Sequence, residues 1–136
     1  MKHLPKVFVV DDDAAMLASL EALFSAEGYA VRCFSTPEGF YAQHHPTEVG
    51  CLVVDMMVPG MGGSELLRRL QDSGSVLSVV VITGLFGPAV GNRGAKLPIT
   101  LLEKPYEVAM LLKMVEDGVA GSIRRRTIQM RGGENN

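Results

Sequence analysis

The sequence predicts an α/β protein in which five strands alternate with helices. Short apolar runs recur along the chain, and most segments between them place apolar residues at the three-to-four spacing of a helix. Strands that alternate with helices in this way form a parallel sheet with helices on both faces. Because crossovers between parallel strands are right-handed, few topologies remain.

The five predicted strands are short runs, most of them rich in valine and isoleucine. They cover residues 6–11, 29–34, 51–55, 76–83 and 99–102. The run at 51–55 is apolar up to its last position, which is typical of a strand buried on both faces. Pro59 and the glycines around it break the chain, so Asp55 is expected where this strand ends and a loop begins.

Two helices are predicted in the first half of the chain. The first begins at Asp13, whose carboxylate can cap free N–H groups, and it ends before Gly28. The second follows Ser35 or Thr36, either of which can cap it, and Pro46 ends it.

The second half is less regular. A third helix is expected from Ser64 to 72, whereas four glycine and proline residues within 85–97 predict a short or irregular helix there. The last helix carries apolar residues from Val108 to Val119. The sequence from 121 to 136 lacks an apolar period, so we expect a disordered C-terminal tail or linker remnant after a domain at 1–120.

The composition fits one globular domain. The chain has 136 residues, of which 47% are apolar, so it can form a proper core. Its formal net charge of −2 gives no indication of nucleic-acid or membrane binding, and no signal peptide or membrane span is visible. The two cysteines, Cys33 and Cys51, lie in predicted strands, and reduced thiols in a cytoplasmic protein are the expectation.

Two further clusters are given no functional role. His44 and His45 are expected to be exposed at the end of the second helix. The arginines at 124–126 are expected in a solvated tail or linker, because nothing else in the chain indicates nucleic-acid binding.

Polar residues follow four of the predicted strands at one edge of the sheet. In open α/β sheets, ligands bind at the edge where the carboxyl ends of the strands meet. The residues expected there are Asp11, Asp12, Asp55, Thr83 and Lys104. Clustered carboxylates raise one another's pKa values unless a cation is present. Mg²⁺ suits them better than Zn²⁺, because no His or Cys lies at these strand ends.

This set of side chains is suited to phosphoryl transfer. The metal and the Lys104 ammonium would neutralise phosphoryl oxygens while the Asp55 carboxylate attacks in line, forming an aspartyl phosphate. Asp55 is the best nucleophile because it stands alone at its strand end. The Thr83 hydroxyl and the backbone N–H of Gly84 can donate hydrogen bonds to the phosphoryl group.

Four motifs in order resemble the receiver domain of two-component response regulators. They are V-F-V-V-D-D-D at 7–13, V-V-D-M-M-V-P-G-M-G-G at 53–63, V-V-V-I-T-G at 79–84 and L-L-E-K-P-Y at 101–106. The resemblance covers about residues 6–119 and is greatest to receivers that precede a helix-turn-helix output domain. It implies a flavodoxin-like (βα)5 fold with a parallel sheet of order 2-1-3-4-5.

The resemblance also implies roles for individual residues. Asp55 accepts a phosphoryl group from the phosphohistidine of a sensor histidine kinase or phosphotransfer protein. Lys104 pairs with Asp55 and then with the phosphoryl oxygens, and the Lys104–Pro105 peptide bond is cis. The implied protein ligands of Mg²⁺ are the side chains of Asp11, Asp12 and Asp55 and the backbone carbonyl of Met57.

The expected activity is that of a cytoplasmic signalling switch, which catalyses only its own phosphorylation and dephosphorylation. Its partners would include a downstream output protein and a second copy, bound through the face of 85–97, 99–102 and the last helix, but not nucleic acid or a membrane. One position departs from the family pattern. Leu101 stands where receivers usually carry an aromatic residue that turns inward, unless Phe86 or Tyr106 substitutes for it.

Two alternatives remain open on the sequence. A pseudo-receiver would bind partners without phosphorylation, and Leu101 and the unusual 85–97 stretch favour it. A phosphatase of the haloacid dehalogenase type also uses an aspartyl nucleophile. That family needs D-x-D followed by Thr or Val, whereas Ala14 and Ala15 follow the acidic run here.

Overall fold

The computed structural model describes residues 4–55, 63–84 and 97–134. In these ranges the chain forms five strands and four helices. Their bounds are β1 Lys6–Val10, α1 Ala14–Ala26, β2 Ala30–Phe34, α2 Pro37–Gln43, β3 Cys51–Asp55, α3 Gly63–Asp72, β4 Ser78–Thr83, β5 Ile99–Glu103 and α4 Val108–Glu134.

The five strands form one sheet of order β2-β1-β3-β4-β5, and every neighbouring pair is parallel. This confirms the predicted flavodoxin-like topology. β3 lies in the centre, and all its residues are buried, from Cys51 to Asp55. The predicted strand at 51–55 therefore has the bounds that the apolar run indicates.

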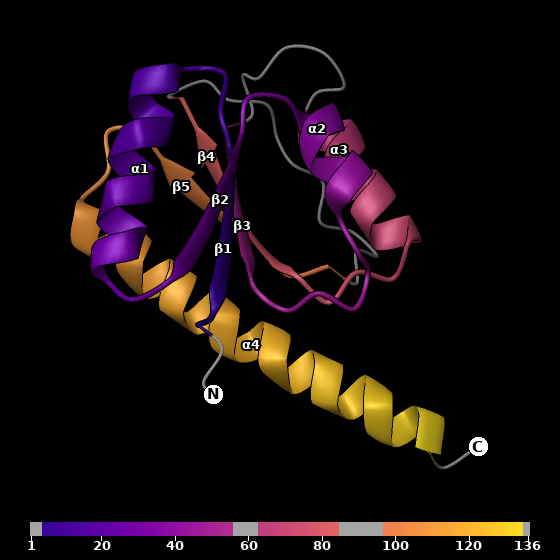
Figure 1. Ribbon diagram of the computed structural model, residues 1–136. Coiled ribbons are helices and arrows are strands. Elements are labelled where there is room, and N and C mark those ends of the chain that lie inside the picture. The colour runs from indigo at the N-terminus through magenta and orange to yellow at the C-terminus, as the bar shows by residue number, and fades with distance from the viewer. Residues whose placement is uncertain (1–3, 56–62, 85–96, 135–136) are drawn as a thin grey trace.

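Helices cover both faces of the sheet (Figure 1). Alternate strand residues point to opposite faces, so Val7 and Val9 pack with α1 and α4, whereas Phe8 and Val10 pack with α2 and α3. Strands buried on both faces are typical of parallel sheets. The two cores fix the sheet between the helix layers and hold its carboxyl edge in place.

The caps predicted for the first two helices are confirmed. The Asp13 carboxylate accepts hydrogen bonds from the N–H groups of Ala15 and Met16, and Thr36 accepts one from Gly39. Gly28 follows α1 with a φ of +92°, a conformation that favours glycine.

The C-terminal residues differ from the prediction. The last helix, α4, continues through Glu134, so a disordered tail from 121 is wrong for the described residues. Polar contacts hold this part of α4 on the rest of the domain, and the residues that make them leave no apolar period in the sequence. Ser122 is fully buried, and its hydroxyl donates to the Val76 carbonyl at 2.7 Å and accepts from the Gly50 N–H at 3.0 Å. Arg126 donates to the Thr47 carbonyl at 2.7 Å, whereas Arg124 is exposed.

His44 also differs from its predicted exposure. His45 is exposed, but the His44 ring stacks on Phe40 with a centroid distance of 5.4 Å. Both His44 ring nitrogens are buried, and neither has a hydrogen-bond partner among the described residues. Burial lowers the His44 pKa, a change that the positive charge of His45 adds to and that Glu48 opposes.

Other expectations have mixed outcomes. The Lys104–Pro105 peptide bond is cis, as the resemblance implies, and Cys33 and Cys51 are both free thiols. The irregular helix expected within 85–97 falls almost wholly outside the described residues. Across the described ranges, no helix is both long and apolar enough to cross a membrane.

Candidate functional site

The carboxyl edge of the sheet brings together four of the predicted site residues. Asp55 and Thr83 are the last residues of β3 and β4, and Asp11 and Lys104 come directly after β1 and β5. Asp11, Asp55 and Thr83 are 5%, 8% and 6% exposed. Burying carboxylates is costly unless they are paired or hydrogen-bonded, so their partners decide what the site can do.

Lys104 is the cation next to Asp55. Its Nζ lies 3.0 Å from Oδ2 of Asp55. The backbone holds the lysine there, because the Lys104 N–H donates to the Thr83 carbonyl at 2.8 Å and so extends the pairing of β4 with β5. The hydrogen bond to Asp55 raises the Lys104 pKa, which keeps the ammonium charged at neutral pH.

Asp11 is the less well compensated carboxylate. Its Oδ1 accepts a hydrogen bond from the Asp13 N–H at 2.9 Å. Burial raises the Asp11 pKa, and the negative charges of Asp55 and Asp12 add to the increase, against the opposing effects of that hydrogen bond and of Lys104. A second cation at this corner of the sheet would therefore be stabilising.

The donor set fits a hard divalent cation. Carboxylate oxygens are the ligands that Mg²⁺ prefers, and the raised pKa of the buried Asp11 indicates that a cation beside this carboxylate would be favourable. Asp12 is exposed, and within the described residues no three acidic, His or Cys side chains are grouped to hold a metal. Met57, the predicted carbonyl ligand, lies outside those residues.

Thr83 and Gly84 border the same corner. The Thr83 hydroxyl donates to the Gly84 carbonyl at 3.3 Å, a long contact that can be exchanged for a better acceptor. Of the residues that the structure describes, none apart from its two chain neighbours has an atom within 4 Å of a Cβ built on Gly84.

Tyr106 is more closely linked to the site than the sequence indicates. The ring is half-buried against the core on the α1 and α4 face. Burial raises the Tyr106 pKa, and the charges of Lys104, Asp11 and Asp55 act on it as well. The sequence gives two signals for this: the position of Tyr106 two residues after Lys104, and its suitability as a substitute for the aromatic residue that Leu101 replaces. Leu101, which stands where receivers usually carry an aromatic residue, is 48% exposed. Phe86, the other residue named as a substitute, lies outside the described residues.

Comparison with known proteins decides which family this edge belongs to. Residues 7–116 match the family model of the response regulator receiver domain. The chain belongs to this family. The receiver domain is the phosphorylation-dependent switch of two-component systems, and the matched range includes all four motifs noted in the sequence.

Curated relatives of the receiver domain are regulators of transcription or response regulators. The chain is 33% identical to the transcriptional regulatory protein FixJ of Bradyrhizobium diazoefficiens over 114 residues, which are 83% of this chain and 56% of FixJ. It is 33% identical to the response regulator protein TmoT of Ectopseudomonas mendocina over 119 residues, 87% of this chain and 50% of TmoT. The receiver thus spans about half the length of these relatives.

Solved structures agree with the assignment. The response regulator StyR is 32% identical and superposes with a TM-score of 0.89, over 97% of this chain and 67% of StyR. The crystal structure of FixJ-N is 30% identical with a TM-score of 0.73, over 88% of this chain and 96% of FixJ-N.

Proposed function

We propose that Asp55 is the phospho-acceptor of this receiver. The observation that carries the proposal is the ion pair of 3.0 Å between Lys104 and a buried aspartate at the carboxyl end of the central strand. A carboxylate there lies in the crevice where open α/β folds bind ligands. The lysine is already positioned to meet the charge of a phosphoryl group that arrives on Asp55.

The phosphoryl donor is the phosphohistidine of a sensor histidine kinase or of a phosphotransfer protein. A carboxylate oxygen of Asp55 attacks phosphorus, the new O–P bond forms as the N–P bond breaks, and the imidazole leaves with the electron pair. The Lys104 ammonium then follows the charge from the carboxylate to the phosphoryl oxygens. Thr83 gives up its contact with the Gly84 carbonyl, and its hydroxyl and the Gly84 N–H donate to the phosphoryl group.

Receiver domains in general bind Mg²⁺ at this site. A bound Mg²⁺ would neutralise the charge on the phosphoryl oxygens. The carboxylates of Asp11, Asp12 and Asp55 and the carbonyl of Met57 would hold it. Support comes from the raised Asp11 pKa, which indicates a corner with too little positive charge.

The domain acts as a cytoplasmic signalling protein rather than as an enzyme on metabolites. It catalyses only its own phosphorylation and dephosphorylation, and a downstream output module reads the result. A second copy would bind through β5 and the start of α4, where Leu101, Val108 and Met110 are 48%, 50% and 53% exposed. Exposed apolar side chains grouped on neighbouring elements favour such a contact.

Intact mass spectrometry tests the phospho-acceptor. After incubation with Mg²⁺ and acetyl phosphate or phosphoramidate, the wild type gains one phosphoryl group, and Asp55→Asn gains none. Asp72→Asn removes an exposed aspartate at the end of α3 and serves as the control that still reacts. A wild type that stays unmodified would leave the pseudo-receiver alternative. Sustained release of phosphate from a generic monoester would indicate the phosphatase alternative.

A further inference from the structure

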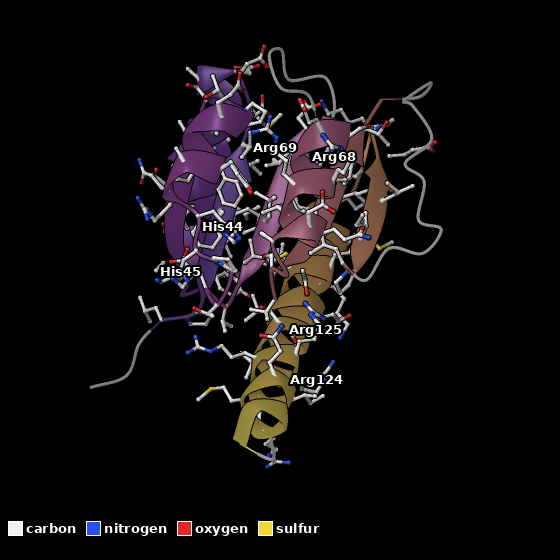
Figure 2. The ribbon with its side chains drawn as sticks, turned by 90° about the vertical axis from the view of Figure 1, so that its right-hand side faces the viewer. His44, His45, Arg68, Arg69, Arg124 and Arg125 are labelled. Carbon is white, nitrogen blue, oxygen red and sulfur yellow. The ribbon has the colours of Figure 1, made fainter. Side chains whose placement is uncertain are left out.

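A second polar site lies at the other edge of the sheet, away from Asp55. A pocket of about 290 Å³ opens between α4 and the beginnings of β4 and β5. Its lining includes two adjacent arginines of α4, Arg124 and Arg125, and two hydroxyl-bearing residues, Ser78 and Thr100. Figure 2 shows the two arginines on the same stretch of α4. This pocket shares no residue with the phosphoryl-transfer corner.

The two guanidinium groups converge on one point above Gly121. A Cβ atom built on this glycine would lie 3.1 Å from Nη1 of Arg125 and 3.6 Å from Nη2 of Arg124. The absence of a side chain at 121 therefore leaves room for both positive groups. Two like charges placed next to the same glycine repel each other, so an anion shared between them would be favourable.

Neither arginine has a carboxylate partner among the described residues. Arg124 makes no hydrogen bond or ion pair there. Arg125 uses Nη2 to donate to the Val76 carbonyl at 3.0 Å and to the Ser78 hydroxyl. Its buried Nε has no partner, which leaves part of the guanidinium unsatisfied. Burial lowers the Arg125 pKa, and the charge of Arg124 lowers it further.

Asp117 is an acidic residue in the lining of the pocket, and it is already paired. Its Oδ1 lies 3.2 Å from Nζ of Lys113, one turn earlier on α4. This ion pair is exposed, so it leaves some negative charge at the rim. Asp117 therefore weakens the affinity for an anion without cancelling two guanidinium groups.

We propose that this pocket binds a phosphate group. Two guanidinium forks match the charge and the several acceptor oxygens of a phosphate dianion, whereas a carboxylate would neutralise only one of them. The volume suits the free ion or the phosphate of a small monoester. The pocket and the Asp55 corner lie at opposite ends of β4, since Ser78 begins this strand and Thr83 ends it.

Titration of the full chain with sodium phosphate, followed by ¹H–¹⁵N NMR, tests the site. EDTA and constant ionic strength exclude divalent metals and general salt effects. Saturable shifts are expected at the amides of Ser78, Thr100, Gly118 and Gly121. A parallel titration with phenyl phosphate shows whether the free ion or a monoester is preferred, and saturable binding of either at these amides supports the proposal.

Three variants test which side chains contribute to phosphate binding in the pocket. Arg124→Gln removes a guanidinium without an internal partner and should weaken binding by roughly fivefold or more. Arg131→Gln makes the same charge change at an exposed position of α4 outside the pocket, and should leave the affinity within about twofold. Asp117→Asn should tighten binding. Shifts confined to Thr83 and Gly84, no saturable binding, or equal losses in Arg124→Gln and Arg131→Gln would overturn the proposal.

Discussion

At the residue scale, two buried carboxylates share one corner of the sheet and one lysine. Lys104 contacts Asp55, and Asp11 has a raised pKa because burial and its acidic neighbours act in the same direction. The ionised form of Asp11 is therefore disfavoured by folding. A buried carboxylate whose ionised form is disfavoured in the free protein is expected at a site that binds a cation.

Replacing Asp11 with Asn should stabilise the free protein at pH 7 by about 0.5–2 kcal/mol. Asn removes the buried charge and keeps an oxygen that can accept from the Asp13 N–H. Because the folded-state pKa of Asp11 is raised, wild-type stability falls as pH rises through that pKa, and it is recovered on acidification. The gain of Asp11→Asn in urea unfolding should therefore shrink toward pH 4. Asp12→Asn, at an exposed position, is the control and should lie within about 0.5 kcal/mol of wild type.

Mg²⁺ should stabilise the wild type more than Asp11→Asn. A ligand that binds only the folded state raises the free energy of unfolding, by about 2.7 kcal/mol at a concentration one hundred times its Kd. We expect Mg²⁺ to raise the Tm of the wild type and to have little effect on Asp11→Asn. Equal shifts in both proteins would show that Asp11 does not hold the metal.

His44 should make the protein acid-sensitive. Its folded-state pKa is lowered, so its contribution to stability is complete above the unfolded pKa of about 6.5 and is lost as pH falls from there through the lowered folded-state pKa. His44→Phe keeps a ring on Phe40 and removes two buried nitrogens that have no partner. Urea unfolding at pH 7.5 and 5.5 should show a smaller loss in His44→Phe than in wild type, whereas His45→Gln should retain most of the loss, because burial is the main cause of the lowered His44 pKa.

At the element scale, α4 joins the two edges of the sheet. Its first half packs Leu111 and Val115 on the core, and its second half is held by polar contacts to the amino ends of β3 and β4. The apolar half was predictable from its 3.6-residue period. The polar half was not, because a single serine and a guanidinium that reach distant carbonyls leave no repeating pattern.

Removing the Ser122 hydroxyl should destabilise the protein by about 1–3 kcal/mol, since Ser122→Ala leaves the buried Gly50 N–H without its acceptor. Amide hydrogen exchange after Gly121 should become faster in the same variant. Thr127→Ala deletes an exposed hydroxyl that bonds only within α4, and it should stay within about 0.5 kcal/mol of wild type. Equal effects of the two substitutions would contradict the role given to Ser122.

At the scale of the whole molecule, most of the fold and the corner of the site follow from sequence patterns. Apolar runs predict the strands, and their last residues predict that Asp11, Asp55, Thr83 and Lys104 meet. The side-chain positions could not be predicted in the same way. The exposure of Asp12 and the stacking of His44 depend on packing between helices and loops, which short-range patterns do not specify.

The central claim is that the phosphoryl group is carried by Asp55 as an acyl phosphate. The most direct measurement is borohydride reduction of the protein after incubation with acetyl phosphate and Mg²⁺, followed by peptide mass spectrometry. Reduction converts a phosphorylated aspartate to homoserine, so the modified position can be read from the peptide. We predict homoserine at position 55 alone, and none when Mg²⁺ is removed with EDTA. Homoserine at Asp11 or Asp12, or no reduced residue in a folded protein, would contradict the account.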